Sequence, residues 1–429
     1  MIQRDIFKTI ETRLNRAGEN GTVILHGMPC VGKSTLMKQI AASRGSGYIL
    51  ADLTTDRELR SVLCDAINDS RHDSVMRTLS DFFGLSQDTF RGTLLLLDGA
   101  EYLQDSVGSL LGKALPTQCM IATDRFDYLC DSSATSDGIC LRKDISCLTE
   151  SNCFRIDVLS FSEFLSAIGR NEYREIIRAR VRDNKPIPRL LREELAEHYY
   201  DYLMVGGFPQ AVIQYSSDRT DIPALRMIHR QILSTIVQSI NGAELGLPAG
   251  ISTVRLNQIF GYLRDHAEST AAFRPGSVHR GLTMRDFANE FRYLQASGLL
   301  IPEYNIITDN GLQRFIANDY DTFYGIEQEH LPFRILRQSL LISCYGNGFI
   351  PVSYDTRKAN YIHVSLPVLS LGITYTPHRR KSSTDAEITG SDQFEQIWIS
   401  DDTSRNPDSN HNIMWYELNE TLIAKKSLN

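Results

Sequence analysis

The chain of 429 residues has no apolar run that approaches the roughly 20 residues needed to cross a bilayer. Its first residues, Met1-Ile2-Gln3-Arg4-Asp5, lack the apolar segment of a signal peptide and are typical of the start of an amphipathic helix. We therefore expect a cytoplasmic protein with no membrane-spanning part.

The chain also lacks a basic excess. Its formal net charge is −7, which gives no general affinity for nucleic acid, so any such contact needs a local basic patch. The hydrophobic share of 42% and the charged share of 23% are typical of a soluble globular protein. The length is too great for one ordinary core and indicates two or three domains, without an internal repeat.

Closely spaced cysteine pairs are missing. Cys130, Cys140, Cys147 and Cys153 lie near one another in sequence, but none is spaced C-x₂₋₄-C as zinc ligands usually are. This spacing favours scattered thiols in a polar insertion, residues 130–152, over a zinc site. The eight cysteines of the whole chain fit a reducing compartment, where most are buried thiols.

What the chain does contain is a complete G-x-x-x-x-G-K-S motif between an apolar run (22–26) that predicts a strand and a segment (35–42) that predicts a helix. Glycines let successive N–H groups turn toward a phosphate, and the helix N-terminus adds positive partial charge. The predicted ATP-binding residues are Gly27, Met28, Pro29, Cys30, Val31, Gly32, Lys33, Ser34 and the spare hydroxyl of Thr35. The alternative is a chance glycine-rich turn.

Within this loop, Lys33 is expected to reach the β- and γ-phosphates, and Ser34 to bind Mg²⁺. Thr35 is a poor candidate for the metal because Ser34 holds the motif position. Cys30 lies beside the loop amides, where positive surroundings could lower its pKa and permit oxidation, although an inert filler position is favoured.

Strand-like and helix-like segments alternate through the first 160 residues. Strands are expected at 47–53, 93–98, 119–123 and 154–158, with helices at 58–70, 74–83 and 101–115. The run 93–98 is apolar until its final acid, which suits a fully buried parallel strand. This alternation predicts an α/β fold, a P-loop domain with a doubly wound, mostly parallel sheet.

The second half of the predicted ATP site is an acid at the carboxyl edge of the strand beside the phosphate loop. Asp98 is placed to hold Mg²⁺. Many such ATPases have Glu next, as the base for hydrolysis, whereas here Gly99 follows. Glu101 is the nearest acid, and the order Asp-Gly-x-acid resembles signalling ATPases of the NACHT class. Glu101 is therefore either the base or simply an acid that opens the next helix.

The strand that follows supplies two further candidates. Thr123 ends it and is placed to contact the γ-phosphate or the attacking water. Arg125 could act on a neighbouring site if the protein forms a homo-oligomer, or it is an ordinary surface arginine.

Beyond residue 160 the pattern becomes helical, with helices expected at 161–168, 172–182, 189–205, 210–215 and 224–240. Further helices at 251–266 and 283–297 precede an expected strand at 299–306, which together suggest a winged helix. After residue 335 short β-like runs such as 361–365 prevail, and 379–392 is expected to be a loop. We predict domains at 1–160 (P-loop), 161–245 (helical lid), 246–330 (winged-helix-like) and 331–429 (small α+β).

Three segments resemble a group of prokaryotic, archaeal-type AAA ATPases. Residues 159–165 read Leu-Ser-Phe-Ser-Glu-Phe-Leu and 205–212 read Val-Gly-Gly-Phe-Pro-Gln-Ala-Val, close to segments of that family, and 291–300 is similar to its winged-helix segment. Residues 314–319 resemble, more faintly, the strand and the acid that follow the winged-helix segment in that family. The resemblance implies an AAA domain, a winged helix and a C-terminal domain with a restriction-endonuclease-like fold.

The chain departs from that family at two places. The family's Asp-Glu pair is replaced by Asp98-Gly99, and residues 340–429 lack the Glu-x-Lys constellation that binds a nuclease's metal. A catalytic nuclease tail is therefore disfavoured, and a degenerate or unrelated tail is expected.

A basic stretch, residues 170–192, carries eight Lys or Arg against three acids. It is either a contact for a phosphate backbone, a source of an arginine for the γ-phosphate, or a solvated helical face. We expect a Mg²⁺-dependent ATPase whose lid and winged helix move with nucleotide. The alternatives are a regulatory or DNA-binding switch with little hydrolysis, working with a DNA or protein partner, and a nuclease-associated ATPase.

Overall fold

The computed structural model describes most of the chain up to residue 317 and parts of the remainder. The described residues are 2–16, 21–45, 47–69, 74–103, 117–124, 152–183, 187–242, 247, 250–266, 273–301, 306–317, 338–339, 341–343, 350–353, 361–366, 369–376, 395–400, 412–413 and 421. None of the helices in these ranges is long and apolar enough to span a membrane.

The first sheet has five parallel strands in the order β2-β3-β4-β1-β5. They are β1 (Thr22–His26), β2 (Tyr48–Asp52), β3 (Leu94–Asp98), β4 (Cys119–Thr123) and β5 (Cys153–Arg155). The helices around it are α1 (Phe7–Arg16), α2 (Lys33–Ser43), α3 (Arg57–Asn68), α4 (Ser74–Phe82) and α5 (Gln87–Arg91), with a 3₁₀ turn, η1 (Ala100–Leu103). The predicted α/β fold with a parallel sheet is therefore confirmed.

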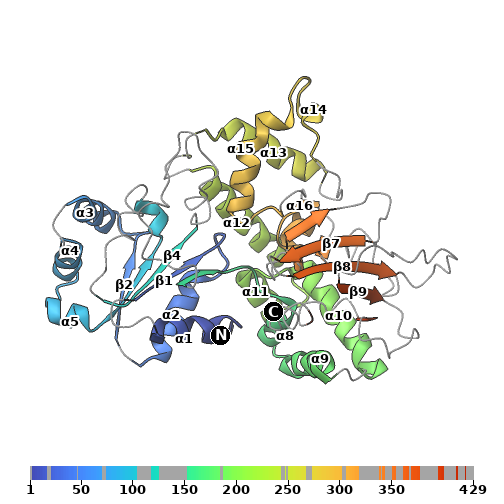
Figure 1. Ribbon diagram of the computed structural model, residues 1–429, viewed down its shortest axis with the longest axis horizontal. Helices are drawn as coiled ribbons and strands as arrows, with labels where there is room; N and C mark the ends of the chain where they lie inside the picture. Colours follow the sequence, from blue (N-terminus) through green and yellow to red (C-terminus); the bar gives the residue numbers. More distant parts are fainter. Residues whose placement is uncertain are drawn as a thin grey trace.

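Alternation along β3 shows why this sheet is covered on both faces. Leu94 and Leu96 belong to the core that contains α1 and α2, whereas Leu95 and Leu97 belong to the core that contains α3 and α4. Successive side chains of a strand point to opposite faces, so a continuous apolar run is buried on both sides. Figure 1 shows α2 and α1 on one side of the sheet and α3 to α5 at its far edge.

The strand order corrects one expectation. β4, and not β3, pairs with β1, so Asp98 lies one strand further from the phosphate loop than we expected. Asp98 and Thr123 nevertheless end neighbouring strands at the same carboxyl edge, because all the strands are parallel.

A layer of helices follows the sheet. It contains α8 (Phe161–Ala167), α9 (Asn171–Asp183), α10 (Arg189–Val205), α11 (Pro209–Ser217) and α12 (Ile222–Ile240), close to the predicted bounds. An aromatic cluster packs α8 on α10, with Phe161 in edge contact with Tyr199 and Phe164 beside Tyr202. We call these five helices the lid.

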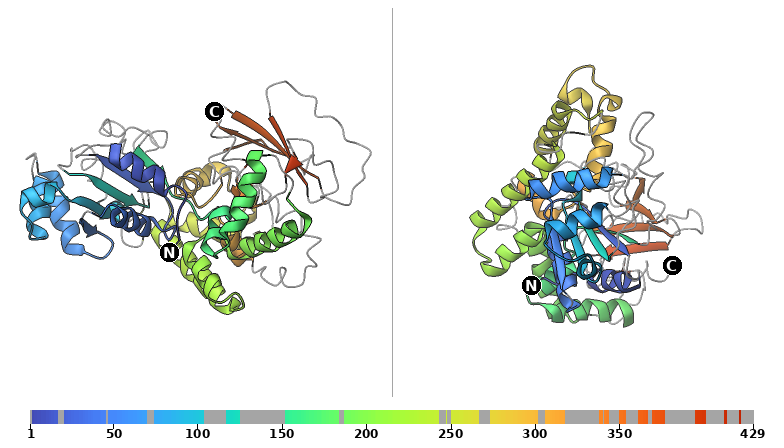
Figure 2. Two further views of the ribbon diagram at one scale, coloured as in Figure 1. Left: turned by 90° about the horizontal axis from the view of Figure 1, so that it is seen from below. Right: turned by 90° about the vertical axis from the view of Figure 1, so that its left-hand side faces the viewer.

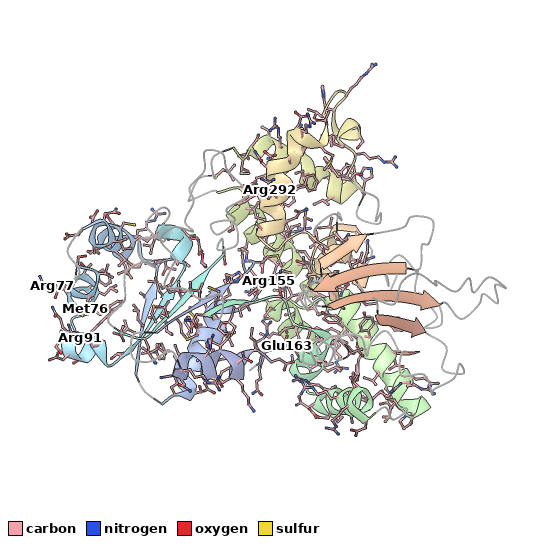
Figure 3. All side chains as sticks on the ribbon, viewed as in Figure 1. Met76, Arg77, Arg91, Arg155, Glu163 and Arg292 are labelled. Carbon is pink, nitrogen blue, oxygen red and sulfur yellow. The ribbon has the colours of Figure 1, made fainter. Side chains whose placement is uncertain are left out.

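Arg4 ties this lid to the sheet. Its guanidinium donates to the Val31 carbonyl, to the Asp157 carbonyl and to Glu163, at 3.1, 2.8 and 3.0 Å. Glu163 also completes the capping box with Ser160 that starts α8. Figure 3 shows Glu163 in the region between the sheet and the lid.

The next unit has three helices, α13 (Thr253–Asp265), α14 (Pro275–Val278) and α15 (Met284–Ala296), which we call the three-helix unit. The prediction of a strand at 299–306 is wrong for the residues that are described there. Of these, only Leu300 pairs with another segment, in an antiparallel bridge with Ile307. Residues 310–317 form a helix, α16 (Asn310–Ala317), and not the strand that the family resemblance implied for 314–319.

A second five-stranded sheet contains β6 (Ile350–Ser353), β7 (Tyr361–Leu366), β8 (Leu369–Thr376), β9 (Glu395–Ser400) and β10 (Asn412–Ile413). β6, β7 and β8 are antiparallel, whereas β8, β9 and β10 run parallel. Figures 1 and 2 show the two sheets at opposite ends of the molecule, the lid between them, and the three-helix unit projecting to one side.

Several expectations fall on residues outside the described ranges. These are Arg125, most of the helix expected at 101–115, nearly all of the insertion at 130–152 with its three cysteines, Cys130, Cys140 and Cys147, and the loop at 379–392.

Candidate nucleotide-binding site

The loop from Gly27 to Ser34 joins the end of β1 to the start of α2, as the motif predicted. Gly27 has a φ of +146° and Gly32 of +94°, conformations that L side chains rarely adopt. A Cβ atom at Gly27 would lie 2.2 Å from the Ile156 carbonyl oxygen. Both glycines are therefore required by the turn itself and by the backbone packed against it.

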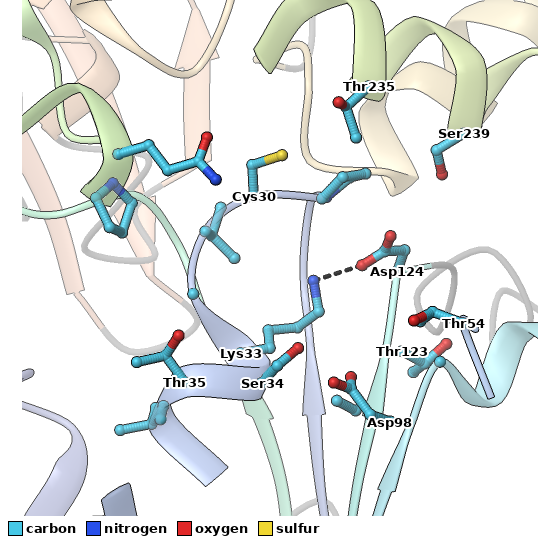
Figure 4. A pocket seen from close by; sticks show the side chains of 18 of the residues that line it. Cys30, Lys33, Ser34, Thr35, Thr54, Asp98, Thr123, Asp124, Thr235 and Ser239 are labelled. Atoms are coloured by element: carbon cyan, nitrogen blue, oxygen red, sulfur yellow. Dashed lines mark ion pairs between the residues drawn. The ribbon is translucent and has the colours of Figure 1, made fainter. Parts of the chain in front are cut away.

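Lys33 is the first residue of α2, and its side chain is buried beneath the loop. Its ammonium donates to the Gly27 carbonyl at 3.0 Å and to the Met28 carbonyl at 2.7 Å. It also forms an ion pair with Asp124 at 2.5 Å, drawn as a dashed line in Figure 4. The cation is thus held at the mouth of the loop.

Ser34 and Asp98, the two predicted metal ligands, lie next to each other, at the start of α2 and at the end of β3 (Figure 4). Burial raises the pKa of Asp98, and the charge of Asp52 adds to the rise, while Ser34 and Lys33 oppose it. Asp52 ends β2 opposite Asp98 in register, so two acids meet at this edge.

Glu101 lies on η1 with only 8% of its surface exposed and lines the same cavity. It accepts a hydrogen bond from the Asp124 backbone N–H at 3.1 Å. Burial, followed by the charge of Asp124, raises the pKa of Glu101 to about 7. A carboxyl that titrates near neutrality inside a cleft is suited to accepting a proton.

Thr123 is buried at the end of β4 and also lines the cavity. In Figure 4 it lies near Asp98 and Thr54, on the opposite side of the cavity from the lid residues Thr235 and Ser239. The structure therefore brings together Lys33, Ser34, Asp98, Glu101 and Thr123 around one space.

That space is a cavity of about 650 Å³ between the sheet and the lid. Its floor is the phosphate loop, including Pro29 to Thr35, and its walls include Ile2, Arg4 and Gln39. The lid contributes six residues from α11 and α12: Pro209, Gln210, Ile213, Thr235, Gln238 and Ser239. A cleft of this volume, with one polar end and an apolar wall, fits a small anionic ligand with a planar group.

Met28 points away from this cavity, toward the chain that follows α15. Its side chain is 3% exposed, and a Cβ atom at Gly298 would lie 3.5 Å from the Met28 Cγ. The Thr308 hydroxyl, which donates to the Gly298 carbonyl at 2.6 Å, lies 3.8 Å from the Met28 sulfur. One loop residue thus packs directly against the segments that flank the Leu300–Ile307 bridge.

Two expectations about this region change. Burial raises the pKa of the Cys30 thiol, and Asp124 adds to the rise more strongly than Lys33 lowers it, which argues against the alternative of a lowered pKa. The described arginines of the stretch 170–192 do not line the cavity. Arg174 and Arg178 instead pair with Asp5, and Arg182 pairs with Asp183.

Sequence reasoning missed Arg4, Asp124 and the six lid residues. Asp124 directly follows Thr123 in the sequence. The reasoning that placed Thr123 in the site, from its position at the end of a strand, therefore applied to Asp124 as well. The lid residues come from α11 and α12, which have no chemical signature of their own and reach the cavity only through tertiary packing.

No protein-family model matches the chain, and no curated protein matches it. Among solved structures, it is similar to a Walker-type ATPase of Pyrococcus abyssi, with 15% identity, a TM-score of 0.48, and coverage of 74% of this chain and 96% of that one. It is also similar to the RuvB Holliday junction branch migration motor of Thermotoga maritima, with 16% identity, a TM-score of 0.32, and coverage of 70% and 89%. Likeness at this level concerns the arrangement of the chain and not its activity.

Proposed function

We propose that the chain binds ATP with Mg²⁺ in the cavity above the phosphate loop and hydrolyses it slowly. The observation that carries this proposal is the meeting of Lys33, Ser34, Asp98 and Glu101 around one cavity at the end of β1. Each of these residues was indicated by sequence alone, and they come from three separate segments.

The donor set suits Mg²⁺. Ser34 and Asp98 present oxygen atoms, which this ion prefers, and both line the same cavity, where they lie next to each other in Figure 4. The negative charge of Asp52 disfavours the ionised form of Asp98. A bound cation would reduce the repulsion between these two carboxylates. Bound Mg²⁺ would neutralise phosphate charge during transfer.

The remaining residues divide the work of hydrolysis. Backbone N–H groups of the loop and the N-terminus of α2 hold the phosphates, with Lys33 at their outer end. Glu101 accepts the proton of the attacking water, and Thr123 orients that water or the γ-phosphate. Ile2, Pro209 and Ile213 form the apolar wall for the adenine ring of ATP.

The test is equilibrium binding of a fluorescent ATP analogue, with Mg²⁺ and with EDTA. We expect Mg²⁺-dependent binding by the wild-type protein, binding at least about tenfold weaker for Lys33→Met, and loss of the Mg²⁺ dependence for Asp98→Asn. Lys8→Met, at an exposed position of α1, is the control for lost charge. Equal affinity of Lys33→Met and wild type contradicts the proposal.

A second candidate function is a nucleotide-dependent DNA-binding switch. The three-helix unit carries four exposed arginines, and none of them forms an ion pair with an acid in the part of the chain that the structure describes: Arg274, Arg280, Arg285 and Arg292. Arg285 and Arg292 lie seven residues apart on α15 and so share a face, on which Asn289 is also exposed. Figure 3 shows Arg292 on that helix. An exposed basic helix face is suited to a phosphate backbone.

The contact of Met28 supplies a physical link between the two candidate functions. A change in the loop on ATP binding would act on Gly298 and Thr308, and hence on the unit that ends there. We propose that nucleotide state moves the lid and the three-helix unit relative to the sheet.

A further inference from the structure

The ammonium of Lys33 has no donor to spare. A lysine side chain offers three N–H donors, and here the acceptors are the Gly27 carbonyl, the Met28 carbonyl and the Asp124 carboxylate. The two carbonyls belong to the loop that cradles the phosphates. The carboxylate comes from a different element, directly after β4.

We propose that Asp124 is an internal anion that occupies Lys33 in the nucleotide-free protein and must release it before the lysine can bind a phosphate of ATP. This proposal rests on the proposed function, because it concerns the same site. A phosphate oxygen needs one of the three donors, and the carboxylate is the partner that can leave without unfolding the loop.

The low exposure of Lys33 and Asp124 strengthens their ion pair, so it competes with nucleotide binding. The side chain of Lys33 is 7% exposed and that of Asp124 is 21% exposed, so solvent screens their attraction only partly. Asp124 also lines the cavity, where its negative charge repels an incoming triphosphate. Both effects lower the affinity for nucleotide.

The same contact has a benefit for the empty site. Without Asp124, a nearly buried ammonium would keep one donor unsatisfied, which is unfavourable. The backbone N–H of Asp124 meanwhile donates to Glu101, so this residue contacts both the phosphate-binding lysine and the proposed base. Asp124 therefore holds the two halves of the site in place until nucleotide arrives.

The test compares Asp124→Asn with wild type in Mg²⁺-dependent binding of the fluorescent ATP analogue. We expect binding about tenfold tighter, since the competing charge is removed while the shape is kept. Asp183→Asn is the matched control, an aspartate paired with Arg182 at 2.7 Å outside the cavity, and its affinity should equal that of wild type. Unchanged or weaker binding by Asp124→Asn overturns the proposal.

A second measurement needs no nucleotide. Thermal unfolding of Lys33→Met, Asp124→Asn and the double variant should show non-additive losses, because each single change removes the same ion pair. Coupling without any ATP binding by the wild-type protein refutes the proposed function and this role together. ATP binding by wild type with additive losses refutes only the role of Asp124.

Discussion

Gly99 has a backbone φ of +78°, and a Cβ atom there would lie 2.7 Å from Cγ2 of Thr54. In the ATPases that the sequence resembles, a glutamate stands at this position. Here neither the backbone conformation nor the space admits a side chain without a shift of Thr54. In the proposed hydrolysis the base therefore comes from another position, and of the three acids that line the cavity, Asp98, Glu101 and Asp124, we propose Glu101.

The raised pKa of Glu101 leads to a pH-dependent prediction. As the base, Glu101 must be ionised, so ATP turnover should rise as the pH increases through about 7. Glu101→Gln should reduce turnover at least about a hundredfold and abolish this rise. Phosphate release between pH 5.5 and 8.5 measures both, and unchanged turnover would remove Glu101 from the mechanism.

Folding stability gives an independent check of the same carboxyl. Its pKa is about 7 in the folded protein against an ordinary value of 4.5, so the folded state binds the proton more tightly. The stabilisation is present at low pH and is lost as the pH rises from 4.5 through 7. Glu101→Gln, which cannot ionise, should gain in unfolding temperature relative to wild type across that range.

The predicted site residues followed from spacing wherever a short motif fixes the local backbone. Lys33 and Ser34 lie where the glycine loop indicated, and Asp98 ends the apolar strand as expected, because both patterns describe single elements. The place of that strand in the sheet, one strand further from the loop, was not predicted. Asp124 could not be assigned in that way. Its role depends on the distance between the end of β4 and the start of α2, which only the strand order determines.

At the scale of elements, the α10–α11 turn and α16 make a very close contact. A Cβ atom at Gly206 would lie 2.4 Å from the Asp309 carboxylate, and one at Gly311 would lie 2.2 Å from the Val205 carbonyl oxygen. Asp309 also accepts hydrogen bonds from the backbone of Gly207 and Leu312, at 2.6 and 2.7 Å. Lid and α16 are therefore packed backbone to backbone.

Two glycines within helices allow this joint to be tested. Gly311→Ala should lower the free energy of unfolding by about 2 kcal/mol or more, because the methyl group overlaps the Val205 carbonyl. Gly261→Ala, in α13 with open space around it, should raise it by roughly 0.5–1 kcal/mol through helix propensity. Urea unfolding of the two variants measures this, and equal effects would refute the close packing.

Elements with a strong periodic pattern were predicted nearly to their ends, as α10 and β4 show. Errors arose where the pattern was short. Residues 299–306 are apolar enough for a strand, but in their described part only Leu300 forms a bridge, to Ile307. The neighbouring residue Thr308 contacts Met28. Residues 310–317 form a helix. Asp309, the residue before it, caps its N-terminus by accepting a hydrogen bond from the Leu312 N–H.

At the scale of the whole molecule, a net charge of −7 coexists with an exposed basic face on α15. Double-stranded DNA, the partner proposed above for this unit, carries the opposite charge to this face. The earlier candidates, Arg178 and Arg182, are paired with neighbouring acids and so have less to offer a phosphate.

We expect Arg285→Ala with Arg292→Ala to weaken binding to double-stranded DNA and to reduce its salt dependence by about two counterions. The matched control is Arg178→Ala with Arg182→Ala, which should change neither. Electrophoretic shift across a salt series, with and without ATP, provides the measurement. Equal losses in both double variants would place the contact elsewhere, and no shift by wild type would exclude a DNA role for this unit.

The packing of Met28 against Gly298 and Thr308 has a thermodynamic consequence. If ATP changes the position of that side chain and thereby the affinity of the three-helix unit for its partner, the partner must change the affinity for ATP by the same factor. The coupling between the two binding equilibria is the same in both directions. A protein built in this way reports nucleotide to its partner and, to an equal degree, reports its partner to the nucleotide.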